Sequence, residues 1–205
     1  MVHAAYKSCN KDINAVSNSR SLVEYVKGEY MHCNMCWLEV DNVIIPIMMD
    51  KKAHWILGLF DFNRRCLHVY NPSRKNVRDR IVSNDVVALS YVLPCLMLKI
   101  NAWQASPADR IGLVKPLDVN ILTNIPQDEN GQDCGLYVLR FAEYLINGQT
   151  NVSSWKFNPV KYRSNLACHL FKHGCEQLVE AYDTDYDLVP RSVRRNRKMK
   201  GLVIE

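Results

Sequence analysis

The sequence predicts one globular domain that combines β-strands and α-helices. The chain has 205 residues, of which 48% are apolar and 23% are charged, a composition typical of globular proteins. Short apolar stretches rich in β-branched residues occur beside longer stretches with helical periodicity. A chain of this length buries about 70% of its unfolded surface, so it needs no disulfide staples.

Four short segments predict strands. Residues 43–49 are apolar, and Pro46 predicts a position near a sheet edge or a bulge, because proline cannot donate a ladder hydrogen bond. Residues 55–61 are apolar on both faces, as in a buried central strand. Residues 66–70 and 117–125 complete the set.

Longer segments predict helices. The first long helix is expected to begin near Ser83 or Asn84 and to kink or split at Pro94. The next is expected to end at Asn147-Gly148, and Gly174 is expected to separate the last two. The expected helices are residues 21–28, 83–100, 134–146, 158–172 and 175–182.

The positive charge is concentrated near the C-terminal end. The formal net charge is +5, but residues 191–200 contain six basic residues and no acidic one. Without these six, the remaining 20 basic and 21 acidic residues give a net charge of −1, which excludes a domain-wide basic surface. The basic run predicts a nuclear address, a segment that touches nucleic acid, or a solvated terminus.

Eight cysteines occur in a chain whose start lacks the apolar stretch of a signal peptide. We therefore expect free thiols and a nuclear or cytoplasmic location. No apolar run reaches about 18 residues, so we expect no membrane-spanning helix.

Some of these cysteines could instead bind zinc, which needs four nitrogen or sulfur ligands. The two groups of candidates lie far apart in the sequence, and only the first is a Cys-x-x-Cys pair, so we expect no metal. The candidates are His32, Cys33, Cys36, Cys168, His169, His173 and Cys175.

A polar break at residues 62–64 predicts a hairpin between the second and third strands. A symmetric two-residue turn would place His54 opposite Asn71, on the same face of the sheet. A side-chain amide can hold an imidazole in one tautomer and orientation, which is the orienting half of a Cys–His–Asn triad. The alternative is that two unrelated polar residues lie at a strand end.

A polar turn precedes Cys134, and the helix that follows has an apolar stripe. We expect Asp133 to cap this helix, so that unpaired N–H groups stabilise a Cys134 thiolate. The same N–H groups could receive an oxyanion, with Gln127 as a side-chain donor, and Gly135 would let another chain approach. The alternative is a buried structural cysteine.

These segments, in this order, resemble the ubiquitin-like-protein (SUMO) protease family. The resemblance is closest to the plant ubiquitin-like protease domains and more distant to adenovirus protease. It rests on a strand with Pro46, the pair His54-Trp55, Asn71 one hairpin later, and the turn that ends in Asp133-Cys134-Gly135. The match runs from about Trp37 to about Leu170.

The resemblance implies a papain-like α+β fold, in which the nucleophile helix packs against a central mixed sheet. It implies a cysteine peptidase or isopeptidase that hydrolyses after the Gly-Gly tail of a SUMO-like modifier, without a cofactor or metal. The partners would be this modifier and its conjugates, and the protein would be a monomer. The implied catalytic residues are Cys134 as nucleophile, His54 as base and then acid, Asn71 as third triad member and Gln127 in the oxyanion hole. The implied substrate-binding residues are Trp55 as a clamp, Gly135 and Asp133.

Three departures from the family pattern leave a second function open. The family usually has aspartate where this chain has Asn71, and an aspartate there would stabilise an imidazolium better. Its oxyanion glutamine corresponds to Asp128, whereas Gln127 has the spacing of the viral relatives. Only 53 residues precede His54, so the N-terminal part of the domain looks shortened. The alternative function is a weak or inactive ubiquitin-like-binding module, or a transposon-derived remnant.

The chain is expected to consist of three parts. Residues 1–36 are a polar N-terminal segment, residues 37–182 the catalytic domain, and residues 183–205 an acidic linker followed by the basic tail.

Overall fold

The computed structural model describes residues 6, 12–29, 35–49, 53–103 and 115–179. The chain divides into two units, residues 1–164 and 165–205, which are described separately. The first unit contains the sheet and the helices around it. The basic tail, the acidic linker, His32 and Cys33 lie outside the described residues.

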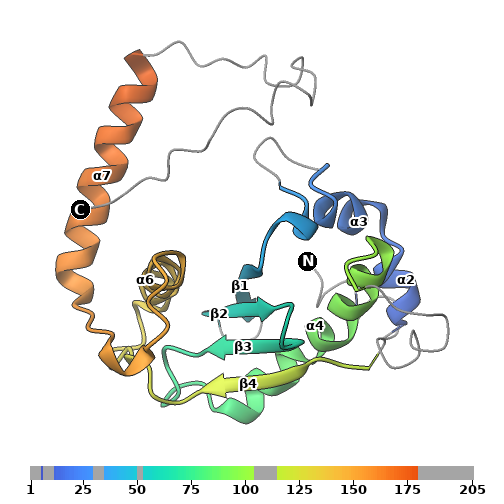
Figure 1. Cartoon of the computed structure of the whole chain (residues 1–205). Coiled ribbons are helices and arrows are strands. Elements are labelled where there is room, and N and C mark those ends of the chain that lie inside the picture. Colours follow the sequence, from blue (N-terminus) through green and yellow to red (C-terminus); the bar gives the residue numbers. More distant parts are fainter. Residues whose placement is uncertain (1–5, 7–11, 30–34, 50–52, 104–114, 180–205) are drawn as a thin grey trace. The chain divides into compact units, whose positions relative to one another are not determined.

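The centre of the first unit is a four-stranded mixed sheet with the order β1-β2-β3-β4 (Figure 1). β1 (Asn42–Met49), β2 (His54–Asp61) and β3 (Cys66–Tyr70) are antiparallel, whereas β4 (Asp118–Leu122) runs parallel to β3. β1 lies at an edge, as Pro46 predicts, and β2 lies inside the sheet. All four predicted strands are therefore confirmed, although β4 is shorter than residues 117–125.

The turn between β2 and β3 corrects the predicted register. Its loop spans four residues, 62–65, and Arg65 has a φ of +51°. Leu57 consequently pairs with Tyr70, so Asn71 follows opposite Ile56 and not opposite His54. The predicted register is wrong by two residues, because the loop is longer than the symmetric turn assumed. A slip of two residues is one full pleat repeat, so Asn71 remains on the face of His54.

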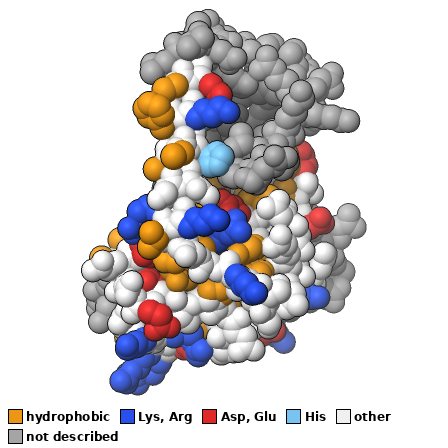
Figure 2. Space-filling view, turned by 90° about the vertical axis from the view of Figure 1, so that its left-hand side faces the viewer, with side chains coloured by type: hydrophobic (Ala, Val, Ile, Leu, Met, Phe, Trp, Pro, Cys, Tyr) orange, Lys and Arg blue, Asp and Glu red, His pale blue; other side chains and the backbone are white. Residues whose placement is uncertain are grey.

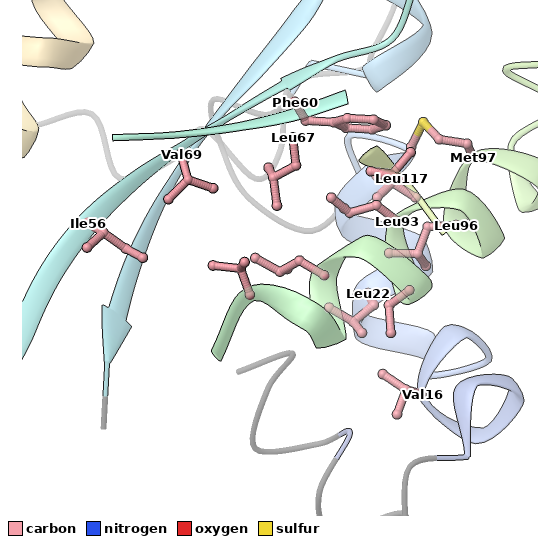
Figure 3. Close-up of a cluster of buried hydrophobic side chains, with 14 of the residues drawn as sticks. Val16, Leu22, Ile56, Phe60, Leu67, Val69, Leu93, Leu96, Met97 and Leu117 are labelled. Carbon is pink, nitrogen blue, oxygen red and sulfur yellow. The ribbon is translucent and has the colours of Figure 1, made fainter. Parts of the chain in front are cut away.

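One face of the sheet packs against α4 (Asp79–Lys99), and α2 (Ile13–Ser17) and α3 (Arg20–Val26) pack against α4. Figure 3 shows side chains of the sheet facing those of α4 in the core. The segment 1–36, which the sequence sets apart, contributes buried side chains to this core. The labelled members are Val16, Leu22, Ile56, Phe60, Leu67, Val69, Leu93, Leu96, Met97 and Leu117.

α4 differs from its prediction at both its start and its middle. It begins at Asp79, before Ser83, and it continues through Pro94 as one helix. Pro94 has no N–H for the carbonyl of Ser90, and this carbonyl accepts the N–H of Leu117 at 2.9 Å instead. The predicted split is therefore wrong.

α4 is also long and apolar enough to cross a membrane by length and composition alone, with a mean hydropathy of 1.7. Because 56% of its most apolar window is buried inside the protein, its composition matches its position in the core.

The opposite face of the sheet packs against α6 (Cys134–Ile146), which ends where the sequence predicts, before Asn147-Gly148. Trp155, just after η2 (Val152–Ser154), stacks on Tyr70 and Tyr144, with ring centroids 5.7 and 4.8 Å apart. The α+β prediction, with a mixed sheet and the Cys134 helix packed on it, is confirmed.

α7 (Pro159–Val179) starts in the first unit and continues into the second. It passes through Gly174 without interruption, so the predicted break there is wrong. A single glycine lowers helix stability but does not have to end a helix.

Candidate active site

His54 and Asn71 form a buried hydrogen bond. The Nε2 atom of His54 lies 2.9 Å from Oδ1 of Asn71, and the two residues are 5% and 0% exposed. Oδ1 also accepts the N–H of Ser73 at 3.1 Å, and Nδ2 donates to the carbonyl of Val77 at 2.8 Å. These two bonds orient the amide, so its oxygen faces His54. His54 must then donate from Nε2, which leaves Nδ1 of the neutral ring as a proton acceptor.

Cys134 is the first residue of α6, and its sulfur accepts a hydrogen bond from the backbone N–H of Trp55 at 3.5 Å. β3 ends at Tyr70, opposite Leu57, so it does not extend far enough to pair with this N–H. The free end of β2 thus presents an N–H donor to the sulfur. It also brings the sulfur beside the residue that follows His54 in the chain.

Asp128 organises the turn that precedes Cys134. Its carboxylate is 3% exposed and accepts the N–H groups of Gly131 at 3.0 Å and Asp133 at 2.8 Å. Its own N–H donates to the carbonyl of Pro72 at 2.6 Å. The negative charge is therefore bound by backbone donors within the turn.

Gln127 links the turn to the loop after β3. Its Oε1 accepts the N–H of Arg74 at 3.0 Å, and its Nε2 donates to the carbonyls of Asn71 at 3.1 Å and Ile125 at 3.3 Å. Both amide hydrogens thus already have acceptors. A role as oxyanion donor would require Gln127 to release one of these bonds.

Asp133 holds the N-cap position of α6 but makes no capping hydrogen bond with its side chain within the described residues. Its carboxylate pairs with Arg163 of α7 instead. The predicted N-cap position of Asp133 is therefore confirmed, but its side chain does not make the capping hydrogen bond. A direct contact between Asp133 and substrate stays a prediction.

Trp55 and Gly135 lie side by side next to Cys134. A Cβ atom built on Gly135 would lie 3.9 Å from Cδ1 of Trp55, and the Trp55 side chain is 38% exposed. The indole therefore has an accessible surface near Cys134.

Two titratable groups around the site have shifted pKa values. The hydroxyl of Tyr137 donates to the carbonyl of Gln127 at 2.8 Å, and burial, followed by Asp128 and Asp133, raises the pKa of Tyr137 to about 12. Hydrogen bonding to Arg74 holds the pKa of Asp79 below its usual value.

The described part of the chain contains no group of three or more His, Cys, Asp or Glu side chains arranged to hold a metal ion. Cys36 is described, but its possible partners His32 and Cys33 are not.

Three features of the site were not predicted from the sequence. The Trp55 N–H contact and the Arg163 ion pair join residues far apart in the chain, and no local pattern signals them. The role of Asp128 could have been found, because aspartate in a glycine-bearing turn often accepts nearby backbone N–H groups.

Replacing Gly131 by alanine should destabilise the protein. Gly131 has a φ of +68°, and a Cβ there would lie 2.4 Å from Nδ2 of Asn76, which donates to Ser73 at 2.9 Å. We expect a loss of about 2–3 kcal/mol in the free energy of unfolding, measured with urea, from the backbone cost and the lost hydrogen bond.

Gly148→Ala is the matched control, because Gly148 has a φ of +69° and, among the described residues beyond its neighbours in the chain, no atom lies within 4 Å of a built Cβ. This variant should lower the free energy of unfolding by about 1–2 kcal/mol, which is the backbone cost alone. Equal losses in the two variants would show that the contact with Asn76 is unimportant.

The chain is similar to known cysteine proteases. Residues 4–178 match the family described as Ulp1 protease family, C-terminal catalytic domain. Sentrin-specific protease 2 of Pongo abelii is 26% identical over 116 residues, which cover 52% of this chain and 16% of that protein. The mouse protein of the same name is 28% identical over 116 residues, with the same two shares. The chain therefore spans only a small part of these relatives.

Two solved structures are similar at low sequence identity. The SUMO protease Ulp1 with its catalytic cysteine oxidised to a sulfonic acid has a TM-score of 0.45 and 16% identity, covering 78% of this chain and 60% of that one. The Ulp1 protease domain in complex with Smt3, the yeast orthologue of SUMO, has a TM-score of 0.44 and 18% identity, covering 71% and 55%. Because the family match covers most of its residues, the chain belongs to the Ulp1 protease family, in the part that corresponds to the C-terminal catalytic domain.

Proposed function

We propose that the chain is a cysteine peptidase that hydrolyses the bond after the Gly-Gly tail of a SUMO-like modifier. The observation that carries this proposal is the buried His54–Asn71 hydrogen bond, with the Cys134 sulfur at the adjacent Trp55 N–H. Family membership and the relatives, which are sentrin-specific proteases, support the substrate class.

In the proposed reaction, Nδ1 of His54 takes the Cys134 proton, and the thiolate attacks the carbonyl carbon of the terminal glycine. The N–H groups of the first turn of α6 receive the oxyanion. The imidazolium then gives its proton to the leaving amine, which frees the lysine side chain or the cleaved peptide. Water activated by His54 hydrolyses the thioester and regenerates the thiol.

Asn71 acts as the third member of the proposed triad. It holds the ring through Nε2, so that Nδ1 is the atom left to exchange the proton. As a neutral group it supplies orientation and only weak stabilisation of the imidazolium. Gln127 as an oxyanion donor remains a prediction.

The substrate tail would lie beside the exposed Trp55 indole, near the start of α6. Only glycine leaves room for an indole to cover the peptide backbone closely, and Gly135 places no side chain beside the indole. This supports a modifier that ends in Gly-Gly over one with larger residues.

A non-catalytic module that binds a SUMO-like protein is the second candidate. The observation that favours it is the hydrogen bonding of Gln127, since an oxyanion hole without a side-chain donor would be weaker.

Nuclear location and a contact between residues 191–200 and nucleic acid are further proposals. On the face drawn in Figure 2, basic side chains stand among acidic ones, so it is no uniformly basic surface.

The reaction predicts covalent capture of a SUMO-like modifier whose C-terminus carries an electrophile. Wild-type protein should form an adduct of the summed mass, and Cys134→Ala should form none, because the sulfur supplies the bond. The measurement is intact-protein mass spectrometry, with Cys168→Ala, an exposed cysteine, as the control that should still react. Binding of the modifier without an adduct would favour the non-catalytic module.

Asn71→Asp should weaken the site, which reverses the expectation drawn from the family pattern. A carboxylate oxygen would replace the NH2 group that donates to the Val77 carbonyl, and it would add a negative charge near Asp79, whose pKa Asn71 helps to lower. We expect the free energy of unfolding to fall by about 1–3 kcal/mol, measured with urea.

The rate of adduct formation should fall in the same variant. A variant that is as stable as the wild type and reacts faster would contradict this account of the Asn71 amide.

A further inference from the structure

Asp133 occupies the position from which an aspartate usually caps a helix. A capping side chain accepts the N–H of the second or third helical residue, here Gly135 or Leu136. Among the described residues, the Asp133 carboxylate makes no such bond and pairs with Arg163. The first turn of α6 therefore keeps these donors free of its neighbouring carboxylate.

The backbone conformation of Asp133 also differs from that of a usual capping residue. Its φ of −109° and ψ of 12° lie in the bridge region and not in the extended region usual for a capping residue. Its N–H is bound by Oδ2 of Asp128 at 2.8 Å. Asp128 thus fixes the main chain of Asp133, and Arg163 fixes its side chain.

The attachment of α7 to α6 does not depend on Arg163. The hydroxyl of Tyr162 donates to Glu143 at 2.6 Å, and Glu143 also pairs with Arg140 at 2.8 Å. Phe157 packs edge-on against Tyr137, with ring centroids 4.4 Å apart. These contacts would remain if the Arg163 side chain, which is 61% exposed, were removed.

We propose that Arg163 is a positioning residue of the active site, an inference that rests on the proposed function. By binding the Asp133 carboxylate, it keeps the N–H groups of the first turn of α6 available to the Cys134 thiolate and to the oxyanion. The Asp133 side chain is only 9% exposed, so without Arg163 its charge would need new donors. The N–H groups of its own helix are next to it in the chain, and the carboxylate would then compete with the reaction for them.

The test compares Arg163→Ala, Arg163→Lys and the double variant Arg163→Ala/Asp133→Ala with the wild type. Lys161→Ala is the matched control, because it removes one exposed positive charge from the same turn of α7. One readout is kcat and KM on a SUMO-like precursor. The other is alkylation of Cys134 by iodoacetamide, resolved by peptide mass spectrometry, which does not require peptidase activity.

For Arg163→Ala we expect kcat to fall about ten-fold, less than for loss of a whole oxyanion donor, while KM stays within about two-fold. Alkylation of Cys134 should slow as well. Arg163→Lys should restore part of both rates. The double variant should react faster than Arg163→Ala, because the competing carboxylate is gone. Lys161→Ala should behave as the wild type does.

A double variant as slow as Arg163→Ala would overturn the proposal, since it would assign Arg163 a purely structural role. Unchanged alkylation and turnover in Arg163→Ala would overturn it too. If the wild type does not cleave the precursor but the alkylation rates follow the expected order, the peptidase proposal fails and the positioning role of Arg163 stands.

Discussion

The loop that follows β3 is the constraint on which both halves of the proposed site depend. Asn71 opens this loop, and its amide is fixed by the N–H of Ser73 and the carbonyl of Val77. Its oxygen can therefore face only one way, toward Nε2 of His54. An amide free to rotate could present its NH2 group instead and would select the opposite tautomer. The closed hydrogen bonds of the loop thus determine which histidine nitrogen is left to act as a base.

The same loop also holds the turn that ends at Cys134, the proposed nucleophile. The carbonyl of Pro72 accepts the N–H of Asp128, and the main chain of Asn71 and Arg74 binds both ends of the Gln127 amide. Imidazole and thiol are consequently positioned by one segment, although they lie on β2 and α6. The buried Asp128 carboxylate has hydrogen-bond partners within the same turn, because it accepts backbone N–H groups there.

Much of this could be predicted from the sequence, because the strands and the Cys134 helix follow from hydrophobic periodicity. The pairing of His54 with Asn71 was predicted from a register that is wrong by two residues. The contact forms nevertheless, because side chains alternate between the two faces of a sheet with a period of two. An error of two residues in the register therefore changes the residue opposite Asn71 but not the face on which Asn71 lies. A slip of one residue would have removed the site.

The remaining features depend on contacts between distant residues. α4 continues through Pro94 because Leu117, from the start of another segment, supplies a hydrogen bond to the carbonyl that proline leaves free. Asp133 fails to cap α6 because Arg163, thirty positions later, takes its carboxylate. Local preferences predicted a break and a cap in these places, and in both cases a tertiary contact outweighed them.

In the proposed site, Asn71 presents His54 to the thiol as a base through Nδ1. Long-range ¹H–¹⁵N NMR of the histidine side chains tests it directly, with the His54 signals assigned from a His54→Gln variant. The account predicts that the neutral ring carries its proton on Nε2, bonded to Asn71, and that Nδ1 is unprotonated. A neutral His54 ring with its proton on Nδ1 would contradict it, because that nitrogen could not accept the proton of Cys134.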